Sequence, residues 1–146
     1  MTVQKSGEGA RRTEDAIKLI RQVLSRGRAK AKKREFLWQD IASAISEIVM
    51  NRTPEAENIL ASLLEFEGKI PLAPESHQTS VMPPEDTLRS IAIRQLSEWT
   101  GRKHLASFKA VQASTSSPTL RSIAQVAIDR SSRRAKRPSR RKRPIG

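Results

Sequence analysis

Apolar residues recur every three or four positions along most of the chain, which is the spacing of one face of an α-helix. This pattern predicts six helices, over residues 13–26, 35–50, 54–66, 85–100, 102–113 and 118–131. The alternation of apolar and polar residues that is typical of strands is missing. Four prolines between 68 and 84 indicate an irregular connection. We therefore predict an all-α fold of antiparallel helices joined mostly by short turns.

One hexapeptide occurs twice without change, as TLRSIA at 87–92 and again at 119–124, 32 residues later. Fixed periods of this size are the signature of stacked repeat architectures. A weaker copy over 53–64 shares the apolar positions of the other two. We therefore expect repeat units that begin near residues 53, 85 and 117.

Capping residues mark where these helices begin and end. Thr53 and Ser117 can each cap a first turn, and Pro54 and Pro118 follow them at a position where proline is tolerated. Thr13 is a similar candidate cap for the first helix. Two glycines are placed to end the third and fourth helices, namely Gly68 and Gly101.

The pattern D-x-L-R-x-x-A at 86–92, a turn at Gly101 and a second L-R-x-x-A resemble HEAT repeats. The resemblance is greatest to the short type, of roughly 30 residues, found in bacterial HEAT proteins and phycobilisome-lyase-like proteins. It extends over 85–128, partly over 53–84, and is only architectural over 13–52. It implies a short HEAT-like α-solenoid of about six helices in antiparallel pairs, in which Asp86, Arg89 and Arg121 form a ladder between neighbouring units.

Stacked helices bury their faces only against neighbours, so the last helix of a stack needs a cap or a partner. The helix over 118–131 is followed by no further helical pattern. Its apolar positions either close the bundle or form an open protein-binding face for a partner or a second copy of the chain. These positions are Leu120, Ile123, Val126 and Ala127.

Charge is distributed unevenly along the chain. Residues 1–35 carry eleven basic and four acidic residues, a net charge of +7, whereas 36–129 carry eight and eleven, a net charge of −3. The last 17 residues carry nine basic residues and no acidic one. We expect a helical domain over 13–131 between a disordered N-terminus, 1–12, and a disordered basic tail, 132–146.

Two basic clusters are candidate nucleic-acid-binding sites, because lysine and arginine at this density neutralise phosphates without reading sequence. Aromatic residues make up only 3% of the chain, so base stacking is poorly supported. The tail also resembles a bipartite nuclear-import signal, and an interaction-free tail is the simpler alternative. The candidates are Lys30, Lys32, Lys33, Arg34, Arg133, Arg134, Lys136, Arg137, Arg140, Arg141, Lys142 and Arg143.

The residues needed for catalysis or metal binding are sparse. Cysteine is absent, and His77 and His104 match no metal motif. Asp40 and Trp99 are residue types that some HEAT-like DNA glycosylases use in a groove, but no local motif accompanies them. We therefore predict no catalytic residue, no cofactor and no metal.

These observations favour a non-catalytic scaffold module that mediates protein–protein interaction and whose basic flanks contact nucleic acid. The main alternative is a nucleic-acid-binding protein whose tail grips the phosphate backbone, and a HEAT-like enzyme is the third. No apolar run approaches the roughly 20 residues that span a bilayer. We expect an intracellular protein without a membrane partner, cytoplasmic or, in a eukaryote, nuclear.

Overall fold

A computed structural model describes residues 2–28, 35–73 and 82–141, with side chains over 12–25, 35–73 and 82–132. The described residues form six helices and no strand, which confirms the all-α prediction. The helices are α1 (Thr2–Arg28), α2 (Trp38–Met50), α3 (Pro54–Glu65), α4 (Pro84–Thr100), α5 (Leu105–Ser114) and α6 (Pro118–Arg141).

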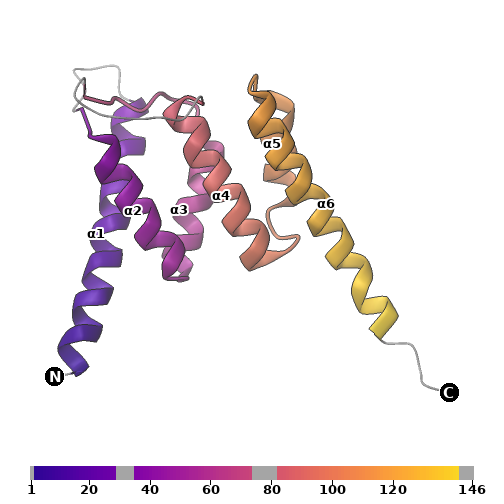
Figure 1. Cartoon of the computed structure of the whole chain (residues 1–146), viewed down its shortest axis with the longest axis horizontal. Coiled ribbons are helices and arrows are strands. Elements are labelled where there is room, and N and C mark those ends of the chain that lie inside the picture. The colour runs from indigo at the N-terminus through magenta and orange to yellow at the C-terminus, as the bar shows by residue number, and fades with distance from the viewer. Residues whose placement is uncertain (1, 29–34, 74–81, 142–146) are drawn as a thin grey trace.

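The helices extend from α1 at one end of the molecule to α6 at the other (Figure 1). The most extensive contacts join α1 to α2, α3 to α4, and α5 to α6. Helix α4 also packs closely on α6, and smaller contacts join α3 to α1 and to α5. The two helices that carry the identical hexapeptide, α4 and α6, are therefore neighbours, whereas α3, which carries the weaker copy, is the partner of α4.

One core of buried apolar side chains extends from Ala16 in α1 to Ile128 in α6. Between α1 and α2, Phe36 is buried and its backbone bridges to the segment after α3. The Phe36 amide donates to the Pro71 carbonyl, and the Ala73 amide donates to the Phe36 carbonyl, both at 2.8 Å. This bridge ties the α1–α2 pair to the end of α3.

Helix α1 begins eleven residues before the expected cap, so the prediction of disorder over 1–12 does not hold for residues 2–12. Thr13 lies inside the helix and is buried, and so it is not an N-cap. The packed turns from Ala16 to Leu24 supply the costly nucleus, after which each added residue needs only one more hydrogen bond.

Helix α6 likewise continues ten residues past 131, through Pro138 to Arg141, where we expected a disordered tail. A proline inside a helix costs about 3 kcal/mol, because it removes one hydrogen bond and crowds a carbonyl. The surrounding arginine, lysine and alanine residues are strong helix formers and extend an already packed helix. Pro138 therefore does not end the helix.

Two of the three predicted side-chain caps are present. The Ala56 amide donates to the Thr53 hydroxyl at 3.0 Å, and the Leu120 amide donates to the Ser117 hydroxyl at 3.2 Å. Gly101 follows α4 with a φ of 62°, the left-handed conformation that favours glycine. Gly68 does not end α3, which stops at Glu65 because Phe66 turns to extended backbone and buries its ring.

The identical hexapeptides occupy matching environments at their apolar positions. The leucines and alanines of both copies are fully buried, and the two isoleucines are half-buried. Their serines differ, because Ser90 in α4 is buried and Ser122 in α6 is exposed. Ser90 belongs to a second buried stripe on α4 with Asp86, Ile93 and Ser97. The equivalent positions on α6, 32 residues later, are all exposed, namely Pro118, Ser122, Gln125 and Asp129.

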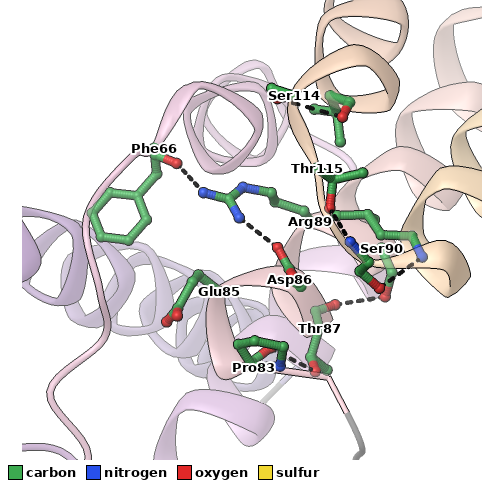
Figure 2. Close-up of polar contacts among 12 residues, drawn as sticks. Phe66, Pro83, Glu85, Asp86, Thr87, Arg89, Ser90, Ser114 and Thr115 are labelled. Carbon is green, nitrogen blue, oxygen red and sulfur yellow. Dashed lines mark hydrogen bonds and ion pairs between the residues drawn. The ribbon is translucent and has the colours of Figure 1, made fainter.

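The arginine of each hexapeptide binds the carbonyl at the end of the preceding helix, and Figure 2 shows this contact for Arg89. Arg89 donates to the Phe66 carbonyl after α3, and Arg121 donates to the Thr115 carbonyl after α5 at 2.8 Å. A cation at this place satisfies a carbonyl that the helix leaves free and interacts favourably with the helix dipole. Asp86 pairs with Arg89 of its own helix, at 2.6 Å, and not with Arg121. The ladder expected between neighbouring units is therefore replaced by two separate arginine–carbonyl ties.

We predict that Arg89→Gln destabilises the protein by about 1–3 kcal/mol, because the Phe66 carbonyl and the Asp86 carboxylate lose a charged donor. The matched control is Arg94→Gln, one and a half turns further along α4, where the side chain is exposed. Its effect on the free energy of unfolding should stay within about 0.5 kcal/mol. Urea denaturation measures both, and equal losses for the two variants would refute the structural role of Arg89.

Candidate binding surface

The four predicted protein-binding residues do not form one surface. Leu120 and Ala127 are buried in the core and are not available to a partner. Ile123 is half-buried, and Val126 is 61% exposed. The helical period explains the division, since α6 turns Leu120, Ala124 and Ile128 into the bundle and leaves Val126 at the edge of that face. The apolar part of the predicted face is thus reduced to Ile123 and Val126.

Ile123 and Val126 lie in a groove between α4 and α6, with a volume of about 360 Å³. Its walls combine apolar, hydroxyl and charged groups from both helices. They are Arg94, Ser97 and Glu98 of α4, and Ser122, Ile123, Val126, Ala127 and Arg130 of α6. The two arginines and the glutamate give the described walls a net positive charge. This groove is the candidate binding surface.

The groove has a rigid frame, because α6 is fixed to the helix ends around it. Near the start of α6, Arg121 binds the Thr115 carbonyl. One turn beyond Ala127, the fully buried Ser131 donates to the Gly101 carbonyl at the end of α4, at 3.0 Å. The second bond joins the two helices that line the groove, and the contact between α4 and α6 holds their spacing.

The side of α6 that lacks a following helix in the described structure is polar. It carries Ser122, Gln125 and Asp129, and the Gln125 amide donates to the Asp129 carboxylate at 2.9 Å. Gln125 also accepts from Gln112 of α5. A polar outer face is what a terminal unit of a stack needs in order to remain in water. This face therefore acts as a cap and not as an apolar docking site.

The structure separates the predicted nucleic-acid-binding residues into two groups. Lys30, Lys32, Lys33 and Arg34, together with Lys142 and Arg143, lie outside the described residues. The other six occupy positions within α6, which runs directly away from the groove: Arg133, Arg134, Lys136, Arg137, Arg140 and Arg141. Arg130 lies just before them and lines the groove itself.

A second cavity, of about 710 Å³, lies where the end of α3, the start of α4 and the side of α5 meet. Its charged groups include Glu65, Glu67, Asp86 and Arg89. Asp86 and Arg89 bind each other, and Arg89 also holds the Phe66 carbonyl. The α5 wall consists mainly of small residues, alanine and serine, which leave space without adding a reactive group. The polar groups already bound to one another stabilise the fold here.

Glu57 in the first turn of α3 contacts two basic side chains from the turn between α4 and α5. Its Oε2 lies 2.5 Å from Lys103 Nζ and 3.2 Å from His104 Nε2. The Lys103 hydrogen bond is the largest influence on the Glu57 carboxyl and lowers its pKa; partial burial opposes this shift, and the His104 contact adds to it. The cluster joins α3 to the α4–α5 turn, and we interpret it as structural.

The side chains weighed for catalysis do not converge. Asp40 is exposed in the first turn of α2, whereas Trp99 is half-buried against the core, 5.7 Å beneath the Arg52 guanidinium. His77 lies outside the described residues. Within those residues, no group of three or more histidines, cysteines or acidic side chains could hold a metal. None of the described helices combines the length and hydropathy required to cross a membrane.

Comparison of the chain with protein-family models, with curated proteins and with solved structures finds no match.

Sequence analysis missed the groove because it depends on α4 lying beside α6. The apolar pattern gave Val126 the same weight as Leu120, although one lies at the edge of the buried face and the other at its centre. Comparing the two repeat copies position by position gives a signal for the outer side of α6 alone. Ile93 in α4 corresponds to Gln125 in α6, and this change from an apolar to a polar residue marks the uncovered side.

We predict that Glu57→Gln lowers the stability at neutral pH and removes part of its loss in acid. A lowered pKa in the folded state contributes stability above the ordinary glutamate value of 4.5, and this contribution disappears as pH falls through the folded value. The difference in unfolding free energy between wild type and variant should therefore be constant near neutrality and shrink in acid.

Glu55→Gln is the matched control, because Glu55 is also in the first turn of α3 but exposed. It reports the effect of removing a helix-dipole charge alone. Denaturation across the acid range compares the two variants. Identical pH profiles for Glu55→Gln and Glu57→Gln would show that the cluster around Glu57 adds nothing.

Proposed function

We propose that the protein is a non-catalytic binding module built as a short HEAT-like α-solenoid. The observation that carries this proposal is the order of helix contacts, in which α1–α2, α3–α4 and α5–α6 form pairs and α4 packs on α6. Three antiparallel hairpins in a row account for those contacts. In this arrangement α1, α3 and α5 form one layer, α4 and α6 form the other, and α2 packs on α1. The repeated hexapeptide then marks the second helix of two successive hairpins.

The chemistry of the described side chains supports binding over catalysis. A general base or a nucleophile needs a second group within hydrogen-bonding distance that activates it. The closest charged groups, Glu57 with Lys103 and His104, and Asp86 with Arg89, tie helix ends together. Extended helical stacks offer long surfaces to macromolecules, and the groove between α4 and α6 is such a surface. We infer that a protein partner binds there.

We predict that Val126→Asp abolishes capture of this partner without unfolding the protein, because Val126 is largely exposed. Met50→Asp is the control, since Met50 in α2 is, with Val126, a large apolar residue that is exposed among the side chains that the structure describes, at 78%. Tagged wild type and both variants are used to capture proteins from cells of the source after nuclease treatment. Circular dichroism and thermal melting verify the fold.

A protein held by wild type and Met50→Asp, but not by Val126→Asp, supports the proposal. No nuclease-resistant protein on any of the three baits would contradict a protein-binding function.

A nucleic-acid-binding function is the second candidate, and the helical continuation of α6 favours it. Arg130, Arg133, Arg134, Arg137 and Arg141 occupy positions i, i+3, i+4, i+7 and i+11 of one helix. Residues at this spacing share one side of a helix and can follow a run of phosphates. The helix also gives the positive charge a direction, which a disordered tail lacks.

We predict that a chain ending at Ser132 binds duplex DNA and RNA with a smaller salt dependence than the full chain. The truncation keeps Ser131, which binds the Gly101 carbonyl, and removes eight basic residues. If all eight contact phosphates, the slope of log affinity against log salt falls by up to roughly 7. Equal slopes for the two chains, or no binding at low salt, would exclude this second function.

A further inference from the structure

We propose that the groove between α4 and α6 binds an acidic amphipathic helix of a protein partner. The partner helix places apolar side chains against Ile123 and Val126 and its carboxylates against the arginines that border and extend the groove. This inference rests on the proposed function and names the chemistry of its partner.

The apolar part of the groove favours a helix over a nucleic-acid backbone. Val126 is 61% exposed, and Ile123, three residues earlier, is half-buried beside it. A volume of about 360 Å³ accommodates a few side chains of a docked segment. Helices that dock in grooves present apolar residues at i, i+3, i+4 and i+7, which fits a short apolar site between two helices. A phosphate backbone would leave these two side chains in water.

The charges around the groove determine the sign of the charge that a partner needs. Arg94 projects from α4 and Arg130 from α6, and Glu98 is the acidic residue among the described walls. Beyond the groove, positions 133, 134, 137 and 141 continue the side of α6 on which Arg130 lies. One side of α6 is thus apolar in its first half and basic in its second. The positions along that side are Ile123, Val126, Arg130 and Arg137. A helix with apolar residues at one end and acidic residues along its length complements this order.

A second copy of the chain is a poorer occupant of the groove. A symmetric dimer through α6 would bring the same patch of both copies together, because a twofold interface pairs a surface with itself. The groove arginines of both copies, Arg94 and Arg130, would then share one interface, and repulsion between like charges opposes association. The partner must instead supply negative charge, which the α6 surface of another copy does not.

The test measures the anisotropy of three labelled probes on the full chain. The first is a synthetic peptide with leucines at i, i+3, i+4 and i+7 and glutamates elsewhere on the helix. The second replaces the glutamates by lysines and keeps the leucines. The third is a short DNA duplex of mixed sequence.

We expect the glutamate peptide to bind and the lysine peptide not to bind. Val126→Gln should weaken the glutamate peptide about tenfold, since an apolar contact of that size is lost. Glutamine is a good helix former, so α6 stays intact. Arg94→Gln and Arg130→Gln should each weaken the peptide about two- to fivefold, the range of exposed ion pairs. Met50→Gln and Lys109→Gln, at exposed positions on α2 and α5, should change nothing.

Several outcomes would overturn the inference. They are equal affinity for the two peptides, no effect of Val126→Gln, or no binding of the glutamate peptide up to about 100 µM, which is weaker than about −5.5 kcal/mol. If the DNA duplex binds more tightly than the glutamate peptide, and Val126→Gln does not change its affinity, the groove region is a nucleic-acid-binding site. Sedimentation that shows a dimer lost in Val126→Gln assigns it to a second copy. A partner captured independently of Val126 leaves the protein-binding function intact and rejects only this site.

Discussion

The packing of α4 against both α3 and α6 is the constraint on which the rest of the structure depends. Leu88, Ala92 and Leu96 of α4 have almost no exposed surface, and they lie on a helix that contacts a partner on each side. Because α4 is enclosed, it buries a second stripe that includes Asp86 and Ile93. A buried carboxylate in that stripe needs a charged or hydrogen-bonding partner, and Asp86 has one in Arg89.

Arg89 and Arg121 give the α3–α4 and α5–α6 connections the same chemistry. In each unit an arginine in the first turns of one helix binds the carbonyl just after the preceding helix. The tie brings a helix start to a helix end, and the negative partial charge at the end of the preceding helix favours the arginine cation. The identical hexapeptide is therefore explained by two requirements at once: leucine and alanine pack the core, and arginine fixes the connection.

The sequence predicted the helical class, four helices to within three residues, and the caps at Thr53 and Ser117, because these features follow from local periodicity and backbone chemistry. It did not predict the extension of α1 and α6, since helix growth from a packed nucleus adds residues that carry no apolar pattern. The groove could not be read from the sequence, because its walls at Arg94 and Val126 come from helices whose adjacency depends on tertiary packing. The basic residues from Arg133 to Arg141 were expected in an unstructured tail. In the structure they occupy helical positions along α6, because that helix continues past its packed turns.

The central claim is that the two identical hexapeptides lie side by side on α4 and α6. The chain has no cysteine, so Arg94→Cys with Val126→Cys gives one pair of spin labels at two exposed sites across the groove. The interspin distance measured by pulsed dipolar spectroscopy should be short and narrowly distributed, as expected for helices whose axes pack about 8–10 Å apart. A long or broad distribution would contradict the adjacency of α4 and α6, and with it the groove that they form.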